Sequence, residues 1–281
     1  MPDSLSDRLA TLAAQPAADL NRDVALDAFH ELLEGLNAGI IRAATRQADG
    51  RWLVHGWVKT GILLGFRLGR IMHVEAGPLH FFDKDTYPPR RLSPDSGVRI
   101  VPGGSAVRSG AYLAPGVVCM PPMYVNVGAY VGEGTMIDSH ALVGSCAQVG
   151  RRVHLSAAAQ LGGVLEPAGA LPVILEDDVF VGGGCGIYEG CLVRAGAVLA
   201  PGVILTRATR LYDLVREQVL TADADGTLEV PAGAVVVPGS RPATSPFART
   251  HGLALYTPVI VKYRDARTDA ATTLEDVLRT S

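Results

Sequence analysis

The strongest constraint on the fold is a six-residue repeat that runs from Val101 to Glu166. The first position of each hexad is apolar and most often β-branched, and the fifth position is usually small. Neither the 3.6-residue period of a helix nor the two-residue period of a strand produces a repeat of six. A short fixed period indicates a stacked repeat, and hexads are typical of a parallel β-helix. The first positions are Val101, Val107, Leu113, Cys119, Val125, Val131, Ile137, Val143, Val149, Leu155 and Leu161.

The repeat predicts a three-sided prism in which each hexad supplies one short strand and one corner. The first residue of the hexad points inward, and the small fifth residue fits where the backbone turns. The predicted fold class is mainly β: a left-handed parallel β-helix of roughly six coils, with an N-terminal α/β cap and a short C-terminal strand–helix extension. Such stacks need caps at both open ends.

Three regions follow from the pattern. Residues 1–97 are predicted to form a mainly helical N-terminal domain with one hairpin, residues 98–241 the β-helix, and residues 242–281 a C-terminal extension. The hexads stop at Glu166 and resume at Leu175, so the eight residues 167–174 are predicted to form a loop that leaves the prism. We expect this loop to cover the active site, since loops that leave a regular scaffold often carry function. A second interruption, 211–229, is predicted to be a hairpin turning at 224–226.

The flanking regions carry weaker signals. Leu5, Leu9 and Leu12 fit one helix face, and Asn21 is the predicted N-cap of a second helix that ends at Gly35 or Gly39. Residues 40–60 are predicted to form a hairpin around a turn at 49–50. Residues 60–75 are predicted to be a buried helix and 76–97 a polar, proline-rich connector. Residues 256–265 are predicted to be a strand and 272–281 a closing helix.

Composition limits the possible functions. The net charge of −3 gives no electrostatic preference for nucleic acid. No run of about 18 apolar residues is present, so no membrane span is expected, and the N-terminus lacks the apolar core of a secretory signal. The four cysteines show no CxxC spacing and are predicted to be reduced residues of the prism interior or corners in a cytoplasmic protein. They are Cys119, Cys146, Cys185 and Cys191.

A hexad prism by itself suits acyl transfer, zinc-dependent hydration or scaffolding, and the fold does not decide between them. A zinc site needs about three converging histidines. The main repeat contains His140 and His154, with the other histidines nearer the chain ends. We therefore expect no metal in the prism and interpret both histidines as surface or interface residues.

The sequence is more specific than its period. The run MYVNVGAYVGEGTMIDSHALVGSCAQVGRRVHLS, followed by LGGVLEP, PVILEDDVFVGGG and IYEG, resembles the tetrahydrodipicolinate N-succinyltransferase family of bacterial lysine biosynthesis. GRWLVHGWVK, GVRIVPGGSAVRSGAYLAPG, PAGAVVVPGS and PVIVKYRD extend the resemblance over most of residues 45–265. The resemblance implies a homotrimer with active sites between neighbouring prisms. It also implies transfer of succinyl from succinyl-CoA to the amino group of the ring-opened dicarboxylate, as one step of diaminopimelate and lysine biosynthesis.

The resemblance implies roles for two residues. Arg99 matches the arginine that binds the dicarboxylate, and Asp138 matches the substrate-binding aspartate to which catalysis is ascribed. Asp138 follows the inward-facing Ile137, so it is expected to point outward from a stacked strand. A carboxylate there can orient the ammonium group of the substrate and assist its deprotonation. The guanidinium of Arg99 offers a planar pair of donors to a carboxylate.

The chain departs from the family at one place. Many members carry Arg-Ser-Glu where this sequence has Gly184-Cys185-Gly186. Glu189 is a nearby carboxylate that serves as a second catalytic candidate or as a structural acid. Glu166, beside the 167–174 loop, is a third candidate and more simply a loop anchor.

The coenzyme contacts are less constrained. Lys262 and Arg264, together with the 167–174 loop, are predicted to contact succinyl-CoA, which acts as a co-substrate; no permanently bound cofactor is expected. Alternatives are a relative that uses acetyl-CoA or another amine acceptor, and a scaffold without enzymatic activity. Flat faces with Tyr124, Tyr130 and Met136 are predicted to meet other chains in the trimer.

Overall fold

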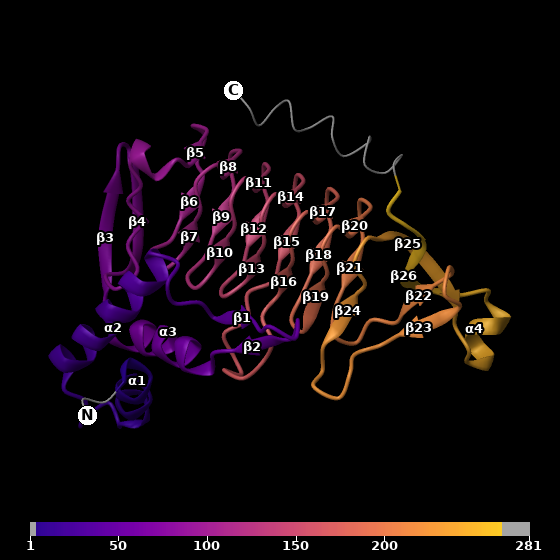
Figure 1. Cartoon of the computed structure of the whole chain (residues 1–281). Coiled ribbons are helices and arrows are strands. Elements are labelled where there is room, and N and C mark those ends of the chain that lie inside the picture. The colour runs from indigo at the N-terminus through magenta and orange to yellow at the C-terminus, as the bar shows by residue number, and fades with distance from the viewer. Residues whose placement is uncertain (1–3, 266–281) are drawn as a thin grey trace.

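The computed structural model describes residues 4–265, most of which form a prism of three sheets of short strands (Figure 1). Within the regular coils a strand pairs in parallel with the strands three places before and after it, so that Tyr130 lies between Tyr112 and Gln148. Partners within an uninterrupted run of hexads are therefore 18 residues apart, or three hexads, whereas partners on either side of the first loop, such as Gln148 and Ile174, are 26 residues apart. The six-residue period is explained by this pairing, because three hexads complete one coil.

Sheet I contains β7 (Tyr112–Leu113), β10 (Tyr130–Val131), β13 (Gln148–Val149), β16 (Ile174–Leu175), β19 (Cys191–Val193) and β24 (Leu228–Val230). Sheet II contains β6 (Ala106–Val107), β9 (Tyr124–Val125), β12 (Leu142–Val143), β15 (Gln160–Leu161), β18 (Gly186–Ile187) and β21 (Ile204–Leu205). Sheet III begins with β5 (Arg99–Ile100), β8 (Val118–Cys119), β11 (Met136–Ile137), β14 (His154–Leu155), β17 (Phe180–Val181) and β20 (Val198–Leu199). It continues through β25 (Ala234–Pro242), β26 (Ala254–Tyr263), β22 (Leu211–Asp213) and β23 (Gln218–Leu220).

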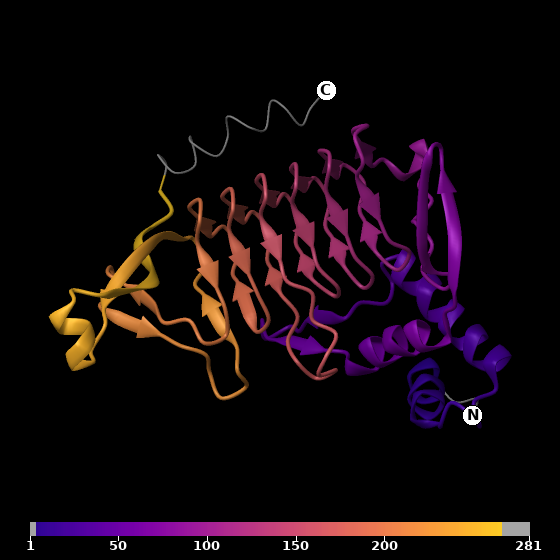
Figure 2. The ribbon, with the colours of Figure 1, turned by 180° about the vertical axis from the view of Figure 1, so that it is seen from behind.

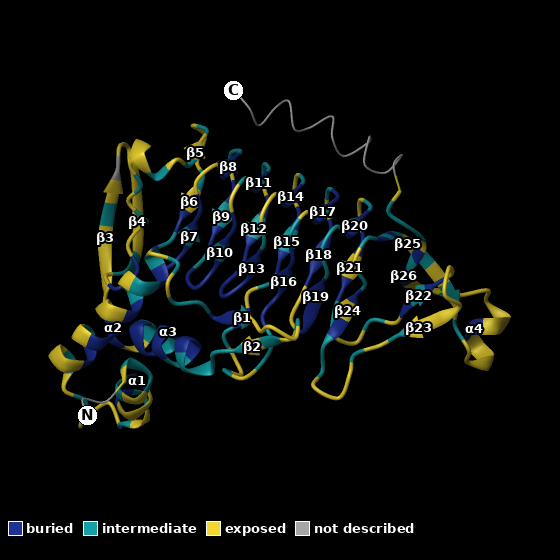
Figure 3. Cartoon of the chain, viewed as in Figure 1, coloured by how far each residue is buried: buried dark blue, intermediate teal, exposed yellow. Residues whose placement is uncertain are grey.

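The interior of the prism is the aliphatic stack that the hexads predict. Every first-position residue of the two hexad runs from Val107 to Leu161 and from Leu175 to Leu205 is buried, as are Val230 and Val236 (Figure 3). The fifth-position alanines and cysteines are buried as well, and all four cysteines are free thiols. Burial raises the pKa of Cys119 to about 12, which keeps that thiol neutral. The inward stacking of the hexads is therefore confirmed.

The first hexad is shifted from its predicted frame by one residue. Ile100, not Val101, lies opposite Cys119, whereas Val107 lies opposite Val125 in the regular register. The corner between β5 and β6 holds one extra residue, and Gly103 adopts a φ of 143° there. Because β5 pairs on one side only, its register is less constrained, and Ile100 remains 41% exposed.

Both interruptions of the prism differ in detail from the prediction. The first loop returns earlier than expected, since Val173 and Ile174 are buried and Ile174 already belongs to β16. In the second, β22 pairs antiparallel with β23, so the hairpin turns at 214–217 and not at 224–226. Asp213 sets this turn by accepting hydrogen bonds from the backbone N–H groups of Val215 and Arg216 at 3.0 and 3.1 Å.

Three helices lie against the side of the prism near its N-terminal end: α1 (Leu5–Ala14), α2 (Arg22–Asn37) and α3 (Gly56–Leu68) (Figures 1 and 2). Asn21 caps α2 as predicted, because its Oδ1 accepts from the N–H groups of Asp23 and Val24. The leucine stripe of α1 packs inward, with Leu9 fully buried. The longest described helix has 16 residues, and no helix within residues 4–265 is apolar and long enough to cross a membrane.

The predicted hairpin at 49–50 is present as β1 (Ala44–Arg46) and β2 (Trp52–Val54), and it lies beside sheet I. The predicted helix 60–75 is correct only as far as Leu68. Residues 71–84, expected to continue the helix and then become a connector, form an antiparallel hairpin of β3 (Ile71–Ala76) and β4 (Leu79–Lys84). The Asp85 carboxylate, which accepts from the Arg70 N–H at 2.7 Å, fixes the base of this hairpin.

A short 3₁₀ turn, η1 (Pro94–Ser96), leads into the prism, and the C-terminal end is closed by β25 and β26 with α4 (Pro246–Thr250) between them. The strand predicted at 256–265 is observed as most of β26. The helix predicted at 272–281 lies outside the described residues.

Candidate active site

Asp138 directly follows β11, at the corner that leads from sheet III to sheet II. The preceding Ile137 is fully buried, and Asp138 itself is partly exposed. Its backbone N–H donates to the carbonyl of Leu155 at 2.9 Å, and its carboxylate accepts from the N–H of Ser139 at 2.7 Å. The partly exposed carboxylate is therefore held at the prism surface, directly after a stacked strand.

Arg99 lies on the same sheet as Asp138. It belongs to β5, which pairs with β8, which in turn pairs with β11. Arg99 is thus two strands away from Met136, roughly 10 Å at ordinary strand spacing. Its side chain is exposed, and no ion pair to it is found within residues 4–265. Arg99 and Asp138 are consequently arranged along one face of a single chain.

Glu189 is not brought to Asp138 within one chain. It follows β18 of sheet II, at the corner that leads to sheet I, and its side chain is exposed. Its Oε1 lies 4.0 Å from Nη2 of Arg207, a distance at which the two charges interact only weakly across solvent. The two candidate carboxylates therefore lie at different corners of the prism.

Tyr188 is a surface residue of this region that the sequence reasoning missed. Its ring lies over two glycines, so that a Cβ added at Gly186 would stand 2.8 Å from Tyr188 Cε2. A Cβ added at Gly162 would stand 2.9 Å from Tyr188 Cδ1. Tyr188 therefore occupies the space that a side chain at position 186 would need. The sequence contains one signal for this contact: the aromatic Tyr188 follows two places after Gly186, and Gly186 occupies an outward position of its hexad.

Lys59 is a second residue that the sequence does not reveal. It belongs to α3, is fully buried, and donates a hydrogen bond to the carbonyl of Ala170 in the first loop. Burial lowers its pKa. A further bond, from the N–H of Gly190 to the carbonyl of Leu171 at 3.2 Å, joins the loop to the prism. Glu166, at the start of this loop, is exposed. The loop is thus attached to both α3 and the prism.

The two predicted coenzyme-binding cations already have protein partners. Nζ of Lys262, on β26, lies 3.2 Å from the carboxylate of Asp265. Nη1 of Arg264 donates to the carbonyls of Asp178 and Gly196 at 3.2 and 3.3 Å. Arg264 therefore joins the C-terminal strand to the prism corners. Lys262 is more readily available to a ligand, because its partner is a surface carboxylate.

The two prism histidines are separated. His140 is exposed, whereas His154 is 5% exposed and stacks on Phe180 with ring centroids 5.0 Å apart. Tyr130, predicted to meet another chain, is half-buried and already has two partners within its own chain. The guanidinium of Arg42 lies 3.7 Å from its ring centroid, and Tyr112 stacks on it at 4.9 Å.

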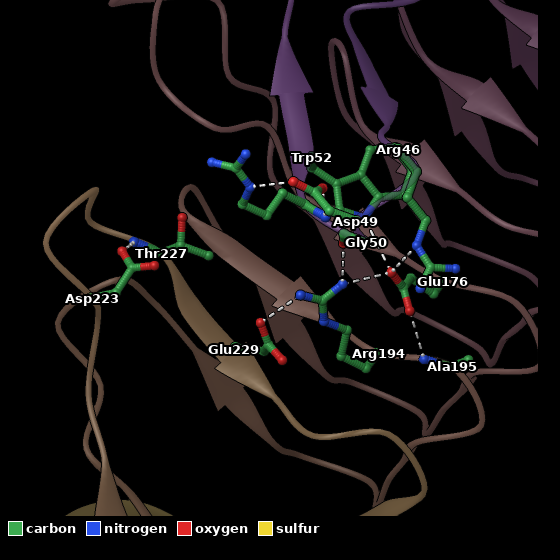
Figure 4. Close-up of polar contacts among 11 residues, drawn as sticks. Arg46, Asp49, Gly50, Trp52, Glu176, Arg194, Ala195, Asp223, Thr227 and Glu229 are labelled. Carbon is green, nitrogen blue, oxygen red and sulfur yellow. Dashed lines mark hydrogen bonds and ion pairs between the residues drawn. The ribbon is translucent and has the colours of Figure 1, made fainter.

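Sheet I also carries a connected polar cluster beside the β1–β2 hairpin (Figure 4). Glu176 is 6% exposed and accepts from Nε1 of Trp52 at 3.1 Å, Nη1 of Arg194 at 3.0 Å and the N–H of Ala195 at 3.1 Å. Arg194 also donates to Glu229 at 2.7 Å. Because every one of these partners of Glu176 is supplied by the chain, we interpret the cluster as a structural link between the hairpin and the prism. A pocket of about 350 Å³ beside it is lined by Arg51, Trp52, Leu171, Leu192, Arg194 and Asp225, among others.

Comparisons with known proteins point to one family. Residues 12–68 match a family model described as Tetrahydrodipicolinate N-succinyltransferase N-terminal. A 2,3,4,5-tetrahydropyridine-2,6-dicarboxylate N-succinyltransferase from Albidiferax ferrireducens is 44% identical over 259 residues, which cover 90% of this chain and 89% of that protein. The protein of the same name from Azoarcus sp. is 44% identical over 272 residues, covering 95% and 92%. Among solved structures, a hexapeptide transferase family protein from Anaplasma phagocytophilum is 16% identical, with a TM-score of 0.35 over 66% of this chain and 86% of that chain.

Proposed function

Because the chain belongs to the 2,3,4,5-tetrahydropyridine-2,6-dicarboxylate N-succinyltransferase family, we propose that it transfers succinyl from succinyl-CoA to the amino group of ring-opened tetrahydrodipicolinate. This acyl transfer is a step of diaminopimelate and lysine biosynthesis. The observation that carries the proposal is identity of 44% to proteins of that name over at least 90% of the chain. We also propose that the prism is a left-handed parallel β-helix and that the enzyme is cytoplasmic.

Asp138 is proposed as the residue that prepares the amine. The substrate nitrogen must lose a proton before it attacks the thioester carbon, and the thiolate of coenzyme A leaves when the new amide forms. A carboxylate at hydrogen-bond distance can bind the ammonium form and accept that proton. The support is positional: Ile137, directly before Asp138, is fully buried, and the backbone N–H of Asp138 is bonded to the next coil. Rigid placement of this kind lowers the entropic part of the barrier.

Arg99 is proposed to bind a carboxylate of the same substrate. It lies on the sheet that carries Asp138, it is exposed, and a guanidinium matches a carboxylate with two parallel donors. The separation of roughly two strand spacings leaves room for a substrate to reach both residues. Lys262 is proposed to exchange Asp265 for a phosphate of succinyl-CoA, with Arg264 and the loop after Glu166 placed beside the coenzyme.

A homotrimer with sites shared between chains is proposed. Asp138 and Glu189 lie at different corners of one prism, so a site that uses both carboxylates needs a second chain. Around a threefold axis, one corner of each prism meets a different corner of its neighbour. Light scattering tests the assembly, and an active monomer at assay concentration would exclude a shared site.

Thiol release in the presence of the cyclic dicarboxylate tests the proposed reaction. We expect release from succinyl-CoA and at most slow release from acetyl-CoA. Faster turnover of acetyl-CoA would change the proposed donor. Thiol release that does not require the dicarboxylate would contradict the proposed acceptor. No thiol release from either donor would indicate a scaffold without enzymatic activity.

A further inference from the structure

The β3–β4 hairpin lies at the N-terminal end of the prism (Figure 1). Three side chains with metal-binding groups meet on it. His73 and Glu75 belong to β3 and His80 to β4, and one ligand atom from each lies within 4.8 Å of the other two. We propose that His73, Glu75 and His80 form a binding site for a divalent transition metal ion of the Zn²⁺ or Ni²⁺ class. The proposed succinyl transfer uses none of these residues.

The register of the hairpin explains why the three residues meet. Glu75 lies directly opposite His80 across the two strands. His73 precedes Glu75 by two residues, and residues two apart on a strand point to the same face. The residue directly opposite His73 is Phe82, whose ring stacks on the imidazole with centroids 5.1 Å apart. The three ligands therefore share one face, and Phe82 supports the orientation of His73.

The distances are close to those of a metal site. Nε2 of His73 and Nδ1 of His80 are 2.9 Å apart and share one hydrogen bond. Oε1 of Glu75 lies 4.0 Å from Nδ1 of His80, and the three ligand atoms, one from each residue, all lie within 4.8 Å of one another. Tetrahedral zinc with bonds of about 2.0–2.1 Å separates two ligand nitrogens by roughly 3.3 Å. An ion that replaces the shared proton therefore needs the two nitrogens to separate by about 0.4 Å. It also needs the rings to turn, because their planes lie only 14° apart and each lone pair lies in the plane of its ring.

The surroundings allow this adjustment. The side chains of His73, Glu75 and His80 are 44%, 68% and 58% exposed, so small rotations meet little resistance. Two imidazoles and one carboxylate suit Zn²⁺ and Ni²⁺, whereas Mg²⁺ and Ca²⁺ prefer oxygen ligands alone. Three protein ligands leave at least one position for water or another ligand. The bound ion would also join β3 to β4, which matters because an isolated two-stranded hairpin is only marginally stable.

The test uses the untagged full-length protein, freed of metal by dialysis against a chelator, and titration calorimetry with ZnCl₂ and NiCl₂. We expect one ion per chain. His73→Ala and His80→Ala should each weaken binding by at least about tenfold, and Glu75→Gln should weaken it less. His30→Ala is the matched control, since His30 is an exposed histidine on α2 that lies outside the cluster. MgCl₂ should not bind to the cluster.

Absence of Zn²⁺ and Ni²⁺ binding to the wild type would overturn the proposal, as would binding that is unchanged in both His73→Ala and His80→Ala. Proteolysis gives a second readout. Metal should slow cleavage at the turn around residues 77–78 in the wild type and in His30→Ala, but not in His73→Ala. Equal protection of the wild type and His73→Ala would place the ion elsewhere. Circular dichroism of each variant separates loss of the site from loss of the fold.

Discussion

The ring of Tyr188 lies over Gly186, so that a Cβ at position 186 would stand 2.8 Å from Cε2 and 3.0 Å from the hydroxyl oxygen of that tyrosine. Tyr188 is 40% exposed and can turn outward, so Gly186→Ala should destabilise the protein by only about 1 kcal/mol. Much of that cost should disappear in a Tyr188→Ala background. A double-mutant cycle from urea denaturation measures the coupling, and additive effects of the two substitutions would contradict the contact.

A different result is expected where a glycine faces backbone. A Cβ added at Gly132 would stand 2.5 Å from the carbonyl oxygen of Gly150 in the next coil. That atom cannot move without breaking the stack, so Gly132→Ala should cost about 3 kcal/mol or prevent folding. Gly169→Ala is the control, because nothing lies within 4 Å of its added Cβ. Thermal melting compares the two variants, and equal melting temperatures for Gly132→Ala and Gly169→Ala would show that the coils are not packed as described.

These two glycines illustrate how far the sequence predicts the fold. The six-residue period determines the prism, since pairing at 18 residues aligns the inward residues within each uninterrupted run of hexads. The outward direction of Asp138 follows from the period alone, since Asp138 comes directly after the inward Ile137. The period does not predict contacts between outward residues, such as Tyr188 over Gly186, because these depend on side-chain direction at a corner.

Elements outside the repeat are harder to predict. The apolar run after Leu68 suggests more helix, yet residues 71–84 form a hairpin because Gly69 ends the helical turn and Asp85 closes the strands. The bond from Lys59 to Ala170 joins residues 111 positions apart, and no local pattern signals such a contact. The meeting of His73 with His80 depends on the same hairpin, which the apolar pattern does not reveal.

Lys59 should make stability depend on pH. Burial lowers its pKa below the ordinary value of 10.5, so the native state loses the proton at lower pH than the unfolded chain does. Between those two values the unfolded chain holds more protons, and stability rises with pH. Lys59→Met should remove this contribution. Urea denaturation from about pH 7 to about pH 10 should show the wild type gaining stability relative to the variant, and parallel curves would contradict the assignment.

Arg99→Ala should raise the KM for the dicarboxylate more than it lowers kcat, because Arg99 is proposed to bind a group distant from the reacting amine. The stability of the variant should stay within about 0.5 kcal/mol of the wild type, since the side chain is exposed. Arg91→Ala, at another exposed arginine, serves as the control. A fall in kcat with unchanged KM would indicate instead that Arg99 stabilises the transition state.

The most direct measurement is the turnover of Asp138→Asn with succinyl-CoA and the cyclic dicarboxylate. Asparagine keeps the size of the side chain but loses its charge and basicity, so kcat should fall on the order of 10²-fold or more. Assembly and succinyl-CoA binding should persist, because the buried Ile137 and Ala141 hold this coil. A near-normal kcat for Asp138→Asn, together with loss of turnover in Glu189→Gln, would contradict the account and assign the base to Glu189.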